Sequence, residues 1–438
     1  MKIFSQSTLF SKIGWQTSVT LIYVAVAFIQ SVLLARYLGV YEFGIFATLF
    51  GISVIISQLT DPRFMDFLIK TLTKYEIESK HKDSQKLIIS CWLIAIIICC
   101  VSCLIILAIE PLILNLFVQD YRDYIYSFPL VLITTFVSTH FFTIFQAVFR
   151  SKGKIKELSI FSITFHLSKI LSLFLYLYLF EVDLFGAILC LAIVNLFFMI
   201  LMFIVVSKQF LFNINYRESL QSALIYFVKE RGLILSLYSS SIASIPQKEM
   251  DIFFFGIFTK PETVGIYRMA KNFTVALWAI VDGLVLLLFP EIVKLNEKKN
   301  WIDLKVLIVR VLKFGFITGM LLVASGYIFL PFIIDILLSE EFKDSYYYSM
   351  ILFAGAIVWL PLSWVYPFAI SSAASKTIAY STLMAGCISS LLYYVFSNYL
   401  FSYGIAIVYA ISPGLASITL LLFLKRFGAF RNLSNTSR

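Results

Sequence analysis

The sequence predicts an all-α membrane protein in which twelve transmembrane helices form two parallel six-helix lobes, with both chain termini in the cytoplasm. Three observations lead to this fold class. The chain is 60% hydrophobic and only 14% charged. Its apolar residues gather into runs long enough to cross a bilayer. Short sequence landmarks also recur half a chain apart, as they do in duplicated transporters.

The composition excludes an ordinary soluble domain, which carries about a quarter charged residues. The first apolar run is too long for the core of a signal peptide, so we expect it to remain as a membrane span. The 6 cysteines all fall within apolar runs. They predict small core residues rather than disulfides or metal ligands. The 3 histidines are too scattered to predict a metal site.

Twelve segments meet the length of about 20 apolar residues that a helix needs to cross about 30 Å of hydrocarbon. Six lie in the first half, at approximately 12–35, 43–60, 87–109, 125–149, 159–180 and 185–206. Six lie in the second half, at approximately 232–257, 264–289, 307–330, 346–368, 378–399 and 404–424.

The basic residues predict the orientation of these spans. With a cytoplasmic N-terminus, the cytoplasmic segments hold 25 of the 35 Lys and Arg residues. The outer loops then hold only Arg36, Arg122, Lys260 and Lys343. This bias is the positive-inside pattern and predicts a multi-pass membrane protein with both termini in the cytoplasm. The net charge of +10 therefore indicates lipid headgroups as partners, and no nucleic acid.

Internal similarity divides the spans into two halves. Gly44-Ile45-Phe46 recurs as Gly265-Ile266-Tyr267, and Ala147 through Lys154 recurs as Ala369 through Lys376. Because each half has six spans, both halves begin on the same side of the membrane. The repeats should therefore be parallel and related by an axis along the membrane normal.

These boundaries predict four parts of the chain. Residues 1–206 form the N-terminal lobe and residues 232–425 form the C-terminal lobe. An amphipathic cytoplasmic connector, 207–231, joins the lobes. A cytoplasmic tail, 426–438, completes the chain.

Two passages carry a family resemblance. Leu34 through Gly44 (LARYLGVYEFG) resembles the ARxLGxxxxG turn between the first two helices of bacterial polysaccharide exporters. Val264 through Ala270, followed by Phe289-Pro290, is similar to the second recurrent passage of that family. The glycines Gly39, Gly44 and Gly265 also have a structural explanation, since they permit tight turns and close helix approach.

The chain thus resembles the O-antigen and capsule flippases of the MOP exporter superfamily, whose fold is shared with MATE transporters. The resemblance implies a flippase for lipid-linked oligosaccharides with proton or sodium antiport as its driving force. It implies membrane lipids and polysaccharide polymerase machinery as further partners. It implies no cofactor, and no nucleotide-binding motif is present.

Five charged residues lie within two predicted spans of the second lobe. They are Lys248, Glu249 and Asp251 in the seventh span, and Arg268 and Lys271 in the eighth. Each ionisable group at mid-bilayer costs about 2.5–3.5 kcal/mol, so such groups face a cavity or a partner. Pro246 should break the seventh helix near this level and free backbone carbonyls.

The seventh and eighth spans form a hairpin about Lys260-Pro261. Residues equally distant from this turn lie at equal depth. Asp251 should therefore lie opposite Ala270, within reach of Arg268 or Lys271.

Two compatible hypotheses describe these charges. One is a cationic cavity that attracts a diphosphate headgroup and acidic sugars. Its substrate-binding candidates are Lys248, Arg268 and Lys271. The other is a salt-bridge network that locks the two spans together. The candidates for this network or for ion coupling are Glu249, Asp251 and Asp282, the last of which lies deeper in the eighth span.

The first lobe offers further candidates. His140 and His166 lie at matching depths in the fourth and fifth spans, and Lys169 shares a helical face with His166. They could form a proton-responsive pair, a second anion contact or packed, hydrogen-bonded side chains. Asp61 and Arg63 end the second span and could gate the cytoplasmic mouth or form a local ion pair.

Alternating access between the lobes would expose the sugars outward while the lipid tail stays in the bilayer. One rival is a MATE-type drug or cation antiporter, which would need net acidic groups in its cavity. Another is a membrane-embedded O-antigen polymerase or ligase, which would need a long outer loop or a catalytic domain. The outer loops are short, so we expect no enzymatic activity.

Overall fold

The computed structural model describes residues 6–61, 64–116, 124, 126–181, 183–210, 231–372 and 375–426. Every regular element in these ranges is helical. The first half contains α1 (Gln6–Thr60), α2 (Phe64–Ile77), α3 (His81–Leu116), α4 (Phe128–Phe136), the π-helix η2 (Val137–Phe141), α5 (Phe142–Ser151), α6 (Ile155–Leu179) and α7 (Leu184–Phe210).

The described residues of the second half form α-helices and two 3₁₀ turns. They are α9 (Arg231–Lys248), α10 (Met250–Phe258), α11 (Pro261–Glu297), α12 (Trp301–Leu337), η3 (Glu340–Phe342), α13 (Ser345–Trp359), η4 (Leu360–Leu362), α14 (Val365–Ser371) and α15 (Ser375–Arg426).

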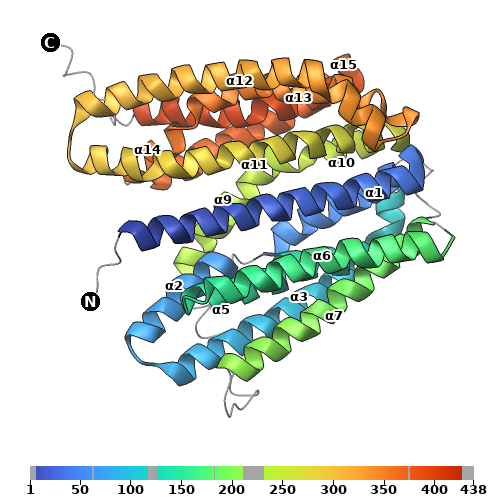
Figure 1. The fold of residues 1–438 in the computed structure, drawn as a ribbon, viewed down its shortest axis with the longest axis horizontal. Coiled ribbons are helices and arrows are strands. Elements are labelled where there is room, and N and C mark those ends of the chain that lie inside the picture. The colour runs from blue at the N-terminus through green and yellow to red at the C-terminus, as the bar shows by residue number, and fades with distance from the viewer. Residues whose placement is uncertain are drawn as a thin grey trace. The chain divides into compact units, whose positions relative to one another are not determined.

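The chain folds as two compact units. The first comprises Met1–Leu33 and Thr48–Ile242, and the second comprises Leu34–Ala47 and Ala243–Arg438. In the first unit α6 lies alongside α7, and in the second α12 lies alongside α13 (Figure 1). The predicted lobe boundaries stay a prediction. Residues 211–230 of the predicted connector and 427–438 of the predicted tail lie outside the described residues.

Each unit has its own apolar core. In the first unit, α2 packs against α5, and the core contains fully buried rings such as Phe67 and Phe145. In the second, Phe255 of α10 stacks on Tyr267 of α11 with ring centroids 4.0 Å apart. The buried aromatic contacts hold each bundle together from within.

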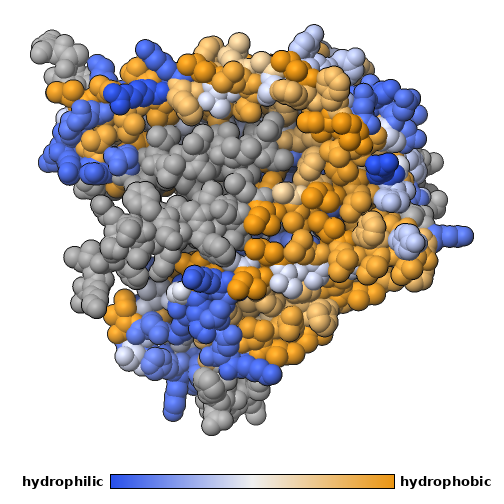
Figure 2. Space-filling model, viewed as in Figure 1, coloured by the Kyte–Doolittle hydropathy of each residue, from blue (hydrophilic) through white to orange (hydrophobic). Residues whose placement is uncertain are grey.

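The outer surfaces of the helices are also apolar. On α12, Phe314, Leu321 and Phe332 are 55%, 63% and 68% exposed. Figure 2 shows apolar side chains spread over the visible helix surfaces and hydrophilic ones gathered toward helix ends. Water would not tolerate this much exposed apolar surface, but lipid does. The chain is a multi-pass membrane protein.

Eight described helices are long and apolar enough to span a membrane. They cover Ile22–Thr60, His81–Ala108, Phe128–Ser151, Ile155–Leu179, Leu184–Phe210, Trp301–Leu337, Glu340–Ser371 and Thr377–Arg426. Two of them contain a non-helical residue, Gly39 (φ 73°) in α1 and Phe401 (φ 50°) in α15. Both breaks fall in turns predicted between adjacent spans. The count of twelve spans and the orientation stay predictions.

The cysteines are only partly as expected. Cys91 is buried, but Cys100 and Cys387 are exposed. The prediction that all are core residues is therefore wrong for these two. Their small, weakly polar side chains are compatible with an apolar helix surface.

The turn that carries the family resemblance packs within the second unit. A Cβ atom on Gly44 would collide with the backbone carbonyl of Pro261, and one on Gly265 would meet the carbonyl oxygen of Val40. The amide of Val40 donates to the Glu341 carboxylate at 3.2 Å. Close backbone approach therefore explains Gly44 and Gly265, as the sequence predicted.

Replacing Gly44 with Ala should destabilise the second unit by about 1–3 kcal/mol, because the collision involves backbone rather than a movable side chain. A lower unfolding temperature of the detergent-solubilised protein would report the effect. Gly232→Ala is the matched control, since a Cβ there meets nothing within 4 Å. An unchanged unfolding temperature for Gly44→Ala would contradict the predicted packing.

Candidate functional site

The first unit contains a polar cavity of about 240 Å³. It lies among the α4–η2–α5 segment, α6 and one residue of α1. The lining residues are Tyr23, Ser138, Phe142, Thr143, Gln146, Arg150, Ile155, Leu158, Ser159, Ser162 and His166. None of them is acidic.

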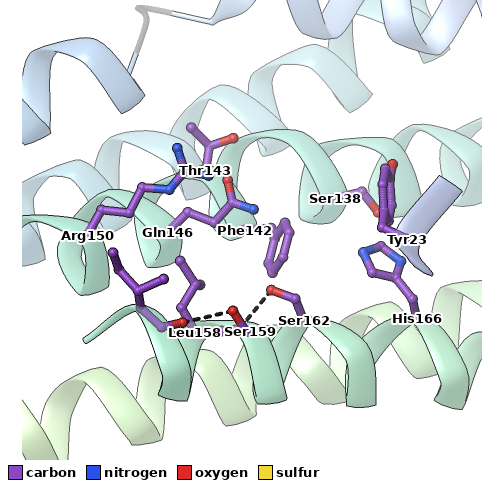
Figure 3. A pocket seen from close by; sticks show the side chains of 11 residues that line it. Tyr23, Ser138, Phe142, Thr143, Gln146, Arg150, Leu158, Ser159, Ser162 and His166 are labelled. Atoms are coloured by element: carbon purple, nitrogen blue, oxygen red, sulfur yellow. Dashed lines mark hydrogen bonds between the residues drawn. The ribbon is translucent and has the colours of Figure 1, made fainter. Parts of the chain in front are cut away.

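The cavity has two distinct ends. Arg150, Thr143 and Gln146 point toward one end, and Ser138 and His166 lie at the other (Figure 3). The ring of Tyr23 lies 4.3 Å from that of His166, measured between centroids. The arrangement combines a cation at one end with aromatic faces and neutral hydrogen-bonding groups at the other.

The α6 wall follows directly from helical spacing. Ser159, Ser162, His166 and Lys169 recur every three or four residues and so share one face. Ser159 donates to the carbonyl of Ile155 and Ser162 to that of Leu158, at 2.9 and 2.8 Å. Their hydroxyl protons are thus engaged, and the oxygens retain accepting capacity toward the cavity.

Arg150, in the last turn of α5, differs from the basic residues Lys152 and Lys154 that follow it. Lys152 forms an ion pair with Glu76, and Lys154 lies 3.5 Å from Glu157. Arg150 pairs with no carboxylate among the described residues. Its guanidinium at the cavity therefore keeps its charge available for an anion.

Lys169 lies behind the opposite end of the cavity. It is 7% exposed, and its Nζ donates to the Ser138 hydroxyl at 2.9 Å. Ser138 donates in turn to Oδ1 of Asn195 at 3.1 Å. The ammonium also lies 4.0 Å from the centroid of the Phe165 ring. No described carboxylate pairs with Lys169, so its buried amino group is held only by neutral groups.

The π-helix η2 shapes this end. The wider turn at Val137–Phe141 interrupts the regular helix at Ser138. Such insertions are frequent at functional sites because they redirect neighbouring side chains. Ser138 contacts Lys169, while His140 lies 3.0 Å from Thr139 Oγ1 and between the rings of Phe64 and Phe136.

The second unit contains a buried ionic cluster at a helix break. Helix α9 ends at Lys248, and Glu249 has non-helical torsions (φ −129°, ψ −14°) before α10 begins. The Nζ of Lys271 lies 3.0 Å from both carboxylate oxygens of Asp251 and 3.0 Å from the carbonyl oxygen of Lys248. Tyr267 donates to Asp251 at 2.6 Å.

The hairpin prediction is confirmed for one pair, since Asp251 reaches Lys271. Glu249 is more distant, with 4.0 Å between its Oε2 and the Lys271 Nζ. Arg268 is half-buried and Lys248 is exposed, whereas Lys271 is enclosed and its donors are engaged. The Asp282 side chain lies outside the described residues.

Of the residues predicted in the first lobe, some lie at the cavity and others do not. His166 lines the cavity and Lys169 lies behind it, but His140 is not among the lining residues. Asp61 accepts from the amide of Phe64 at 3.3 Å, which places it at the start of α2. Arg63 lies outside the described residues.

Sequence reasoning missed Arg150 and Gln146 as cavity residues. Arg150 belongs to a basic cluster at a helix end, where a solvated or headgroup-facing charge is the ordinary expectation. The available signal was the spacing of Thr143, Gln146 and Arg150 on one face of the same helix. This spacing predicts a polar helix face, but it does not predict which other helix that face packs against.

Comparisons with solved structures show the same fold at low identity. An inward-facing multidrug resistance MATE family transporter of the MOP superfamily is 16% identical, with 96% of each chain covered and a TM-score of 0.70. The lipid II flippase MurJ in an inward closed conformation is 15% identical, with 93% of this chain and 86% of that chain covered and a TM-score of 0.69. A MOP superfamily transporter from Pyrococcus furiosus is 14% identical, with 96% of each chain covered and a TM-score of 0.56.

The sequence comparisons identify the family. No curated protein matches the chain. The model of the family described as polysaccharide biosynthesis protein matches residues 9–296, which is more than half of the chain. This match agrees with the resemblance carried by the Leu34–Gly44 turn, and the chain belongs to the polysaccharide biosynthesis protein family.

Proposed function

We propose that this protein is a flippase that moves polyprenyl-diphosphate-linked oligosaccharide repeat units, of O-antigen or capsule type, across the bacterial inner membrane by alternating access. Family membership and the fold shared with a lipid II flippase support the proposal. The single observation that carries it is the polar cavity of the first unit. That cavity has Arg150 at one end, Lys169 behind the other, and no acidic lining residue.

The Arg150 end suits a phosphate group. A guanidinium presents paired N–H donors that match two phosphate oxygens, and it keeps its charge at any physiological pH. The side-chain amide of Gln146 and the hydroxyl of Thr143 lie beside it and can complete the hydrogen bonds of an anionic headgroup.

The opposite end suits a sugar. The rings of Tyr23, Phe142 and His166 offer faces for a pyranose, and Ser138 and Ser162 offer hydrogen-bonding oxygens. The volume of about 240 Å³ is below that of a typical ligand pocket. Only part of a lipid-linked oligosaccharide would occupy it, with the lipid tail left in the bilayer.

The second unit would contribute ion coupling and further anion contacts. Lys248 and Arg268 are the candidates for contact with the substrate, and Lys271 would hold the α9–α10 break. Coupling to H⁺ would involve the acidic candidates Glu249 and Asp251, and coupling to H⁺ or Na⁺ would involve Asp282. Delivered repeat units would pass to polysaccharide polymerase machinery, and the chain itself would catalyse no covalent step.

The rival function is a drug or cation antiporter of MATE type, which the TM-score of 0.70 to a multidrug transporter makes worth testing. A cation site in a membrane needs buried acidic groups. The lining residues of the first-unit cavity include Arg150 and no acid. This charge balance favours an anionic substrate.

Loss of the protein should trap lipid-linked repeat units in the cytoplasmic leaflet. In cells lacking the chain, these units should accumulate and stay protected from a membrane-impermeant glycan-modifying reagent. Restoring the wild-type chain should expose them. Normal exposure of the repeat units without the chain would reject the flippase function.

A further inference from the structure

The break between α9 and α10 gathers oxygen atoms around one point. The carbonyl oxygen of Lys248 and both carboxylate oxygens of Asp251 lie 3.0 Å from the Lys271 Nζ. Oε2 of Glu249 lies 4.0 Å away from the same nitrogen. Asp251 is 0% exposed and Lys271 is 5% exposed. Two carboxylates and a backbone carbonyl thus lie around the Lys271 ammonium.

This oxygen set is of the kind that binds an alkali cation. Carboxylate and carbonyl oxygens are the preferred ligands of hard metal ions. A broken transmembrane helix supplies such carbonyls, because its backbone acceptors are no longer used within the helix. The Tyr409 ring, whose centroid lies 4.5 Å from the Lys271 Nζ, adds a face that attracts cations.

The buried Asp251 carboxylate also requires a cation at this position. An ionised carboxylate buried without a partner costs several kcal/mol. In this structure the Lys271 side chain of α11 supplies the required positive charge. Its four-carbon stem extends from a helix whose neighbouring residues Tyr267 and Ala270 are fully buried.

We propose that Lys271 is a tethered cation, whose ammonium group permanently occupies a monovalent-cation site at the α9–α10 break. Free Na⁺ therefore does not bind there during the working cycle of the wild-type protein. Removing the ammonium opens the site to Na⁺. The inference concerns the ion and not the cargo, so it holds for any substrate.

Thermal unfolding of the purified full-length protein tests this directly. It is measured in NaCl, choline chloride and methylammonium chloride at equal ionic strength. The wild-type protein should unfold at the same temperature in all three salts. Lys271→Ala should unfold at a lower temperature in choline and gain about 4 °C in NaCl, at a concentration near a hundred times its dissociation constant. Methylammonium, which replaces the missing charge, should stabilise this variant as well.

Two control variants separate this site from general salt effects. Lys313→Ala removes an exposed lysine of α12 and should respond to the three salts as the wild type does. Lys271→Ala combined with Asp251→Ala should lose the gain in NaCl. Should Lys271→Ala give no folded protein, Lys271→Gln enters the same comparison, because its amide can still donate to the Lys248 carbonyl.

Either of two results would overturn the proposal. The first is a Lys271 variant with the same unfolding temperature in all three salts. The second is a wild-type protein that Na⁺ stabilises and that loses this response with Asp251→Ala. Both results concern ion binding only, so neither depends on whether the protein is a flippase.

Discussion

Asparagine in place of Asp251 should cost about 3–5 kcal/mol of stability, because it leaves the buried Lys271 ammonium with only the more distant Glu249 carboxylate, 4.0 Å away, as a counter-charge. Asp251 is fully buried and contacts the ammonium through both oxygens at 3.0 Å, in addition to accepting from Tyr267. The amide keeps the size and the hydrogen-bond acceptor but removes the charge. We expect a sharply reduced folded yield and a much lower unfolding temperature in detergent.

The double variant Asp251→Asn/Lys271→Met separates charge from packing. With both charges removed, the desolvation cost disappears, and stability should recover toward the wild-type value. Asp335→Asn is the matched control, since Asp335 is an exposed acid in the same unit. If the double variant is as unstable as the single one, the unpaired charge is not the cause of the instability.

Hairpin geometry explains why this pair could be predicted from the sequence. Residues equally distant from a tight turn share a depth, and Lys260-Pro261 marks that turn clearly. The sequence therefore predicts Arg268 or Lys271 as the partner of Asp251. The choice between the two depended on rotamers and on the exact position of the helix break, which falls at Glu249, three residues after Pro246.

The turns between two pairs of adjacent spans could also be predicted from the sequence. The breaks at Gly39 and Phe401 fall between runs of apolar residues that are each long enough to cross a bilayer. Gly39 favours positive φ by its chemistry. Phe401 has no such preference, so only the run lengths on either side predicted that turn.

The cavity could not be predicted because it depends on which helix faces meet. Arg150 lies at the end of a basic segment where charge is expected for orientation alone. The π-helix that redirects Ser138 leaves no recognisable pattern in the residues Val137–Phe141. The spacing of His166 and Lys169 predicts that they share a helical face, but the groups that hold Lys169 come from separate helices.

Glutamine in place of Arg150 should weaken substrate binding about 10- to 150-fold, equivalent to the 1.5–3 kcal/mol of a hydrogen bond to a charged group. Arg150 has no carboxylate partner among the described residues and points into the cavity (Figure 3). The loss should therefore appear in the substrate concentration needed for half-maximal transport by the reconstituted protein. Unfolding temperature should change little, because no ion pair is broken.

Two matched variants decide whether the charge binds substrate or only orients the helix at the membrane surface. Lys156→Gln removes an exposed basic residue at the start of α6, close to Arg150 in the sequence, and should leave transport unchanged. Arg150→Lys keeps the charge but loses the paired donors, so it should recover only part of the binding. If Arg150→Gln and Lys156→Gln transport the substrate equally well, Arg150 does not bind substrate and contributes only to the orientation of its helix in the membrane. The anion site would then have to be sought at Lys248 and Arg268 of the second unit.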